Sequence, residues 1–234
     1  MTGAPWIRKC TIRYSDSRLE FTGIFPNVAW KSRTAPRTPY ALLRAAQAIT
    51  QVKGTQFYGK KWINAARLYL EEYIVPIVGR TPYGVVPFGL FRGQPTADTY
   101  RTLGSGLTYR FFMPAQNGVF WVGLNAHLLS HALFFAEAGK FFSQSSYRDL
   151  SYRQLEWIFG SNPFGASLAT GIGRKSPSLF SRFLGPINGG IMNGIGGDNE
   201  DQPILDMPNS ENWRNNEYWS PHVGYCQWAL SALL

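Results

Sequence analysis

The sequence predicts an all-α fold built from helical hairpins. Apolar residues recur at helical spacing in several segments, and short connections would join neighbouring segments into antiparallel pairs. The alternation of strands and helices that a doubly wound sheet requires is not visible in the pattern. No repeat with a period of about 20 to 50 residues is visible either, which argues against a solenoid. We therefore expect toroid-like α/α packing, with long loops between the helix pairs at one end of the bundle.

Composition and charge are those of a folded domain. The 234 residues are 44% hydrophobic and 15% aromatic, which is enough to bury one sizeable core and excludes a disordered chain. The net charge of +9 would suit an anionic partner. Because the basic residues are scattered and no nucleic-acid motif accompanies them, we expect no nucleic-acid binding. We also expect no membrane span and no signal peptide, since neither an eighteen-residue apolar run nor a basic-then-apolar start occurs.

Residues 1–37 differ from the rest of the chain. The stretch from Trp6 to Tyr14 alternates roughly and contains β-branched residues, so we expect a short strand there. Pro26 and Pro36 interrupt the residues after this stretch. We therefore divide the chain into an irregular, strand-like segment over 1–37 and a helical domain over 38–234.

The first predicted hairpin opens at Thr38-Pro39, a capping residue followed by proline at the first helical position, and its first helix ends at Gly54. A second helix is expected from about Phe57 to Ile74, stopping before Pro76 because proline cannot donate the next hydrogen bond. The segment from Gly79 to Gly118 is rich in glycine and proline and is predicted to be a long loop.

The second predicted hairpin consists of helices over about Leu124–Ala138 and Tyr147–Phe159, joined by a turn between Gly139 and Ser146. His127 and His131 are four residues apart and share a face, as in zinc-binding helices. The glutamate of the zinc-protease motif is missing and no third ligand is suggested, so we expect ordinary hydrogen-bonded histidines, no metal and no cofactor.

Two cysteines, Cys10 and Cys226, lie near opposite ends of the chain, without the spacing of zinc ligands. They could form one disulfide between the termini. Two buried free thiols are the favoured interpretation.

Between Gly160 and a closing apolar helix from about His222 lies a long segment rich in glycine, asparagine and aromatic residues. A segment of this length without regular structure is uncommon in a compact domain unless it carries a site. It includes Asn162-Pro163, the run from Ser167 to Gly173, the pairs Gly189-Gly190 and Gly196-Gly197, and Asn216-Glu217.

These motifs, with the preceding helix that ends in Ile-Phe-Gly, resemble the C-terminal half of the family 9 glycoside hydrolases, the cellulase and endoglucanase family. The resemblance covers roughly residues 38–234 and implies an (α/α)6 barrel of helical hairpins, of which this chain would form part. It also implies a secreted or periplasmic location if the chain is cut from a longer precursor.

The resemblance assigns the general acid to Glu217. Inverting glycosidases protonate the leaving oxygen with one carboxyl group while a second activates water, the two lying about 6.5 to 9.5 Å apart. We expect Trp213, Tyr218 and Trp219 to desolvate Glu217 and to bind substrate. Without the resemblance, Glu217 would be an ordinary glutamate near a helix N-terminus.

Arg182 aligns with the arginine of the family's His-x-Arg motif, where this chain has Phe180-Ser181-Arg182, and is expected to bind sugar hydroxyls. Four aromatic residues in and after the predicted loop could stack on sugar rings, although each one singly is better explained by core packing: Phe91, Tyr109, Phe120 and Trp121.

The general base is not assigned by the sequence. The family takes it from an Asp-x-Gly-Asp motif, and this chain has none. Asp198, Asp201 and Asp206 precede Glu217 and could line the same site. Because a complete barrel needs about twice this length, the resemblance implies a missing N-terminal half or a second copy of the chain as partner. Two alternatives stay open: a carbohydrate-binding or assembly half-domain without a base, and a polysaccharide lyase with a tyrosine base and a basic cleft.

Overall fold

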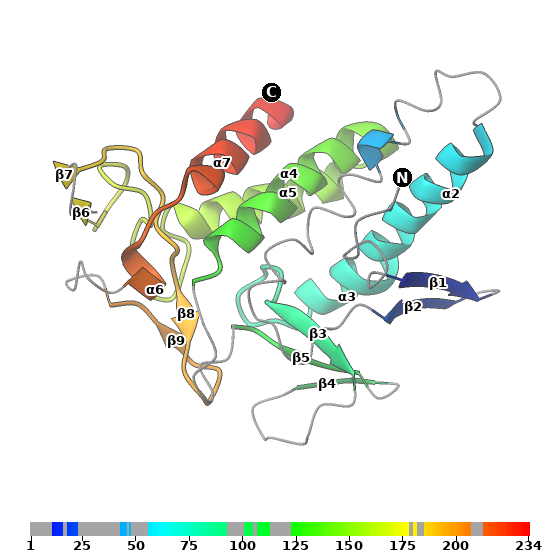
Figure 1. Cartoon of the computed structure of the whole chain (residues 1–234), viewed down its shortest axis with the longest axis horizontal. Helices are drawn as coiled ribbons and strands as arrows, with labels where there is room; N and C mark the ends of the chain where they lie inside the picture. The colour runs from blue at the N-terminus through cyan, green and yellow to red at the C-terminus, as the bar shows by residue number, and fades with distance from the viewer. Residues whose placement is uncertain are drawn as a thin grey trace, which may run out of the picture.

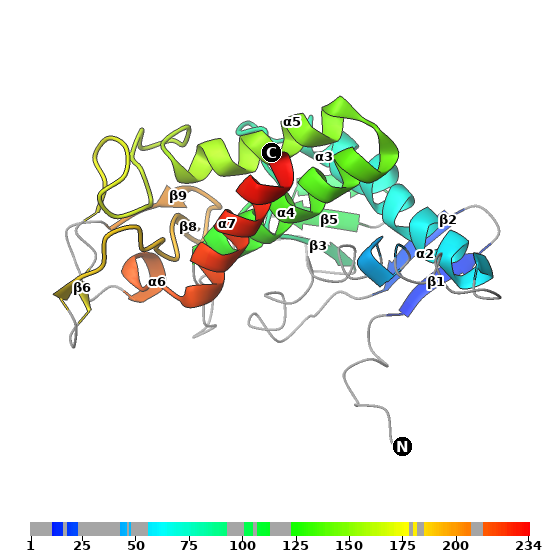
Figure 2. The same cartoon turned by 90° about the horizontal axis from the view of Figure 1, so that it is seen from above.

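The computed structural model describes residues 11–15, 18–22, 43–45, 47, 56–92, 101–104, 107–112, 123–177, 180–181, 185–206 and 213–234. Three helices form the centre of the described structure: α4 (Asn125–Phe142), α5 (Ser145–Ile158) and α7 (Ser220–Leu233). Both α5 and α7 pack against α4, and the three lie side by side in Figure 1 and Figure 2. The expectation of a mainly helical fold is confirmed, whereas a complete ring of six hairpins stays a prediction.

The predicted hairpin between α4 and α5 is confirmed, with a tight turn at its end. Ser143 adopts the left-handed conformation with φ of 54°, which ends α4 and reverses the chain. Gly139 lies inside α4, where a Cβ atom would stand 2.6 Å from the side chain of Arg148. The missing side chain therefore lets the start of α5 approach α4 closely.

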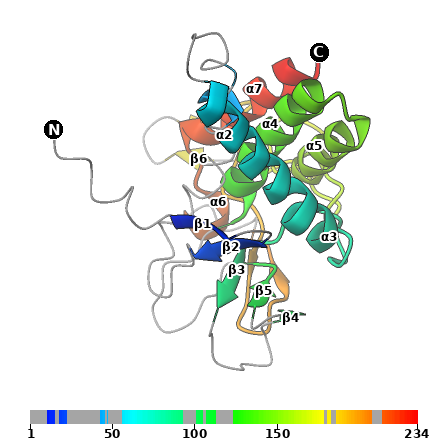
Figure 3. The same cartoon turned by 90° about the vertical axis from the view of Figure 1, so that its right-hand side faces the viewer.

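Helix α4 is buried on nearly all sides, because helices cover more than one of its faces. In the view of Figure 3, α2 (Gln56–Leu68) crosses in front of α4, while α5 and α7 flank it. Two side chains join the elements by hydrogen bonds to main-chain carbonyls. Ser151 donates to the carbonyl of Ala132 at 2.7 Å, and Arg148 donates to the carbonyl of Leu233 at 2.7 Å.

The helix predicted to stop before Pro76 continues through that residue. After α2, the chain forms a π-helical turn, η3 (Tyr69–Ile74), and then α3 (Val75–Val78), in which Pro76 occupies the first turn. The amide of Val75 donates to the carbonyl of Leu70, five residues back. The wider turn and the new helix start place the proline where its missing N–H group is tolerated, so the predicted end is wrong.

The predicted loop between Gly79 and Gly118 contains a small sheet. Strands β3 (Gly89–Arg92), β4 (Arg101–Gly104) and β5 (Leu107–Arg110) form an antiparallel sheet in the order β3-β5-β4. The sheet leads directly into Phe111 and Phe112, whose rings pack against Tyr83 in the core. Tyr109 is buried, which supports core packing over sugar stacking for this residue.

At the N-terminus, β1 (Thr11–Ser15) pairs with β2 (Arg18–Thr22), and β1 overlaps the strand predicted from Trp6 to Tyr14. Of the predicted helix over 38–54, residues 43–45 and 47 are described and are helical, and Leu43 lies in the core. The domain boundary at residue 38 stays a prediction. Cys10, Phe120, Trp121 and Arg182 lie outside the described residues.

Cys226 is a free, buried thiol on α7, and burial raises its pKa to about 11. Within the described part of the chain, no helix has both the length and the apolar character needed to cross a membrane.

The paired histidines of α4 are hydrogen-bonded to the protein, His131 being buried and His127 partly buried. His127 Nε2 lies 2.9 Å from the carbonyl oxygen of Pro87. His131 Nδ1 lies 3.0 Å from the carbonyl oxygen of His127, and its Nε2 lies 2.8 Å from the hydroxyl of Tyr69. Burial lowers the pKa of His127 to about 4 and holds the pKa of His131 well below its usual value, so both rings are neutral at neutral pH.

Neutral buried histidines predict acid sensitivity. Between pH 6.5 and about pH 4, an unfolded chain protonates His127 whereas the folded chain does not, so the free energy of unfolding falls as the pH falls through this window. We expect His127→Gln to reduce this slope by up to about 1.4 kcal/mol per pH unit, the value for one proton. Urea unfolding of both proteins at a series of pH values measures the difference, and identical slopes would contradict the assignment.

Candidate functional site

A glycine-rich strip over residues 189–195, here called the central strip, connects the elements of the candidate site. On one side it pairs with the Leu168–Thr170 segment that follows α5. The amide of Met192 donates to the carbonyl of Leu168 at 3.1 Å, and the amide of Thr170 donates to the carbonyl of Gly190 at 2.9 Å. The run from Ser167 to Gly173 and the glycine pair at 189–190, noted separately in the sequence, therefore lie together.

The central strip also caps the N-terminus of α4. Leu124 donates its amide to the carbonyl of Ile195 at 3.0 Å, and Asn125 donates its amide to the carbonyl of Asn193 at 3.0 Å. The Asn125 side chain donates to the carbonyl of Met192 at 2.9 Å. Because α4 has no side-chain cap, these main-chain carbonyls satisfy amides that a helix N-terminus leaves without helical partners.

The opposite edge of the central strip holds the segment that carries Glu217. Asn193 donates its amide to the carbonyl of Glu217 at 2.6 Å, and Gly194 donates its amide to the carbonyl of Asn215 at 2.9 Å. Met192 and Tyr218 form an isolated antiparallel bridge. The backbone on both sides of Glu217 is thus anchored, through the strip, to the central helix.

The Glu217 side chain is exposed to solvent, and its Oε2 atom lies 3.4 Å from the side-chain nitrogen of Asn193. Tyr218 is half-buried against the core, and Trp219 is exposed at the start of α7. Trp213 begins the short helix α6 (Trp213–Asn216). The expected enclosure of Glu217 by aromatic side chains is therefore not seen among the described side chains.

Two asparagines before Glu217 hold the loop in place, and one of them, Asn215, was not among the residues predicted for the site. Its side chain is buried and donates to the carbonyls of Gly194 at 2.7 Å and Ile204 at 3.2 Å. Asn216 donates to the carbonyl of Asp206 at 2.7 Å. An Asn-Asn pair directly before a candidate glutamate is a usable signal, because asparagine side chains hydrogen-bond readily to loop backbone.

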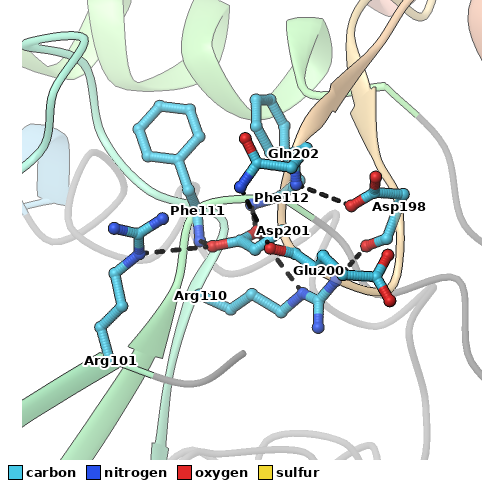
Figure 4. A network of polar contacts seen from close by, with 8 residues as sticks. All are labelled: Arg101, Arg110, Phe111, Phe112, Asp198, Glu200, Asp201 and Gln202. Carbon is cyan, nitrogen blue, oxygen red and sulfur yellow. Dashed lines mark hydrogen bonds and ion pairs between the residues drawn. The ribbon is translucent and has the colours of Figure 1, made fainter. Parts of the chain in front are cut away.

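Asp201, one of the three aspartates considered for the base, is buried in a polar network shown in Figure 4. Its carboxylate accepts hydrogen bonds from the amides of Phe111 at 2.9 Å and Phe112 at 2.8 Å. The Nε atoms of Arg110 and Arg101 lie 3.5 Å and 3.6 Å from the same carboxylate. Arg110 is completely buried. This carboxylate therefore ties β5 and the residues after it to the loop before α6.

Burial raises the pKa of Asp201, while the two amide donors and the two arginines act in the opposite direction. Its neighbour Asp198 accepts a hydrogen bond from the amide of Gln202 at 2.7 Å, inside a tight turn. The main-chain carbonyl of Asp198 accepts from the buried guanidinium of Arg110. Both aspartates thus have structural roles here, and Asp206 is held through its backbone by Asn215 and Asn216.

The mainly helical fold of the described residues is cellulase-like. The chain is similar in structure to the catalytic domain of Clostridium thermocellum CelT, with a TM-score of 0.51 and 13% identity. The similarity covers 83% of this chain and 38% of that chain. At this identity the likeness concerns the fold alone, and the chain spans less than two fifths of that domain.

Two further cellulases match less closely in overall geometry. The cellulase Cel9M of C. cellulolyticum has a TM-score of 0.49 and 16% identity, over 83% of this chain and 38% of that one. Endoglucanase CelQ from C. thermocellum, complexed with cellobiose and cellotriose, has a TM-score of 0.38 and 18% identity. That similarity covers 48% of this chain and 22% of the CelQ chain. No protein-family model and no curated protein matches the sequence.

The Asp201 network predicts a large effect of a small substitution. Asp201→Asn turns one acceptor into a donor that faces a backbone N–H. The substitution also removes the negative charge that lies 3.5 Å from the buried Arg110. We expect the free energy of unfolding to fall by about 3 to 5 kcal/mol. In the control Asp198→Asn, one side-chain oxygen can still accept from Gln202, so the loss should stay below about 1 kcal/mol. Equal effects in urea unfolding would contradict the structural role of Asp201.

The central strip predicts a matched pair of glycine substitutions. Gly194 has φ of +90°, and a Cβ atom there would stand 2.3 Å from the Asn125 side chain, so Gly194→Ala should cost about 3 kcal/mol. Gly224, inside α7, has no heavy atom within 4 Å of the same position. Gly224→Ala should therefore stabilise the protein by about 0.5 to 1 kcal/mol. Thermal unfolding should show a lower melting temperature for Gly194→Ala and a higher one for Gly224→Ala than for the wild type.

Proposed function

We propose that the chain is a glycoside hydrolase domain that cleaves β-linked polysaccharide or oligosaccharide by inversion, with Glu217 as the general acid. The observation that carries the proposal is the placement of Glu217. Its carboxyl group reaches solvent while its backbone is hydrogen-bonded to the buried central strip, within a cellulase-like fold. A general acid needs this combination, because it must reach the substrate and hold its position as the proton moves.

In this mechanism Glu217 donates a proton to the glycosidic oxygen as the bond from that oxygen to the sugar carbon breaks. A second carboxylate removes a proton from the water that attacks the opposite face of the ring. Inversion follows because the attack comes from the side opposite the leaving group.

Substrate contacts are proposed for four residues. The exposed indole of Trp219, two residues from Glu217, suits stacking against the apolar face of a sugar ring. Tyr218 would present its hydroxyl, since its ring is half-buried against the core. Trp213 is proposed because it lies near Glu217 in the sequence. Arg182 is proposed from the sequence resemblance and would bind sugar hydroxyls.

The base is proposed to come from outside the described residues. Asp198 and Asp201 serve the polar network, and the matched cellulase domain is much longer than this chain. A missing N-terminal half or a second copy of the chain would supply the second carboxylate. The structural roles of Asp198 and Asp201, which leave the chain without an assigned base, also favour a second candidate function. In this alternative the chain is a non-catalytic carbohydrate-binding or assembly half-domain.

The test is release of reducing sugar by the purified chain from cellulose, mixed-linkage glucan and chitin-derived oligomers. We expect Glu217→Gln to lower the rate by about 10² to 10⁴-fold, the usual contribution of acid catalysis. Glu156→Gln, which changes an exposed glutamate on α5, should keep full activity. Equal rates in the wild type and Glu217→Gln would remove Glu217 from the mechanism. A folded chain that binds oligosaccharides without cleaving them would favour the half-domain.

A further inference from the structure

We propose that Asn193 is a positioning residue for Glu217 and determines which carboxyl oxygen carries the catalytic proton. This inference rests on the proposed function, because it concerns the same acid. Asn193 contacts Glu217 twice, through the backbone at 2.6 Å and from side-chain amide to Oε2 at 3.4 Å. Of the described residues, it is the one whose side chain donates a hydrogen bond to the Glu217 carboxyl group.

Asn193 is well suited to fix another group because its own position is over-determined. It is 2% exposed, and its carbonyl accepts from the amide of Asn125 at 3.0 Å. The next residue, Gly194, lies so close to Asn125 that a Cβ atom could not fit. The Asn193 side chain therefore starts from a backbone that cannot shift without disturbing the N-terminus of α4.

The side-chain NH₂ group of Asn193 affects which oxygen of the Glu217 carboxyl group is protonated. A side-chain NH₂ group donates and does not accept, so the carboxyl oxygen that faces it must be an acceptor. The unprotonated carbonyl oxygen of a carboxyl group accepts better than the O–H oxygen does, so the Asn193 contact favours the acid form with its proton on Oε1. In the reaction, the Oε1–H bond breaks and the proton forms a bond to the leaving glycosidic oxygen. The resulting carboxylate keeps the Asn193 hydrogen bond at Oε2.

The same contact also limits rotation of the carboxyl group. An exposed glutamate side chain samples several rotamers, and only some direct the proton toward a bound substrate. One hydrogen bond from a buried partner favours the rotamers in which Oε2 faces the strip and Oε1 faces away from it. Asn193 thus supplies orientation without itself touching the substrate.

The first experiment needs no enzymatic activity. In ¹⁵N-labelled protein, the Asn193 side-chain NH₂ signals, assigned by their loss in Asn193→Ala, should shift with pH along one carboxyl titration. In Glu217→Gln the Asn193 side-chain signals should no longer shift with pH. The side-chain signals of the other asparagines and glutamines should keep the pH dependence that they have in the wild type. Signals that do not move with pH, or that move equally in Glu217→Gln, would overturn the contact on which the proposal depends.

The second experiment is kinetic. We expect Asn193→Ala to lower kcat by about 10-fold, part of the usual contribution of acid catalysis, with KM changed less than about 2-fold. Asn193→Asp keeps the shape and puts a carboxylate beside Glu217. Since two close carboxylates resist double ionisation, the limb of the pH–rate profile that reports the acid should move to higher pH.

Asn188→Ala is the matched control, because Asn188 is an exposed asparagine in the turn that precedes the strip. It should leave kcat and the pH profile unchanged. If Asn193→Ala lowers activity only in proportion to its folded fraction and Asn193→Asp leaves the profile in place, the positioning role is rejected. If the wild-type chain releases no sugar, it is a half-enzyme or a binding half-domain and not a hydrolase that acts alone, while the spectra still decide whether Asn193 orients the carboxyl group.

Discussion

The candidate site depends on the way the N-terminus of α4 is satisfied. This helix starts without a side-chain cap, and its first amides donate to carbonyls of the central strip. The positive end of the helix dipole thus meets oriented main-chain oxygens in the interior of the protein. The strip is held there and pairs on its other edge with the residues around Glu217. Moving the glutamate would therefore require breaking hydrogen bonds at the start of α4, which is largely buried.

The helices could be predicted because each has a pattern of its own. The α4–α5 hairpin and the closing helix follow from apolar spacing and from the residues at their ends, and the structure has them within a few residues of the predicted bounds. The prediction failed at Pro76, where a π-helical turn changes the hydrogen-bond pattern. It also failed for β3, β4 and β5, because composition rich in glycine and proline does not separate a small irregular sheet from a loop.

The candidate site was only partly predictable, because several of its residues are held by partners far away in the sequence. Sequence motifs marked Glu217 and the glycine pairs, and the structure brings these motifs together through the central strip. The sequence did not show that Asn193 and Asn215 hold the loop, since their partners are main-chain atoms far along the chain. Nor did it show that Asp201 is a buried structural carboxylate, because its amide and arginine partners come from Arg101 to Phe112. Such roles are set by tertiary neighbours and leave no local pattern.

The central strip also bears on what sequence comparison can detect. Glu217 is placed mainly by hydrogen bonds between main-chain atoms, which any residue except proline can make, and by glycines that leave room for close approach. The main-chain part of this geometry puts few demands on the surrounding side chains, whereas Asn125, Asn193 and Asn215 contribute through their own amide groups. Substitutions can accumulate around such a framework until sequence similarity is lost while the chain path persists. Such a framework is compatible with the two findings on this chain, which matches no family model and is similar in fold to the catalytic domain of CelT at 13% identity.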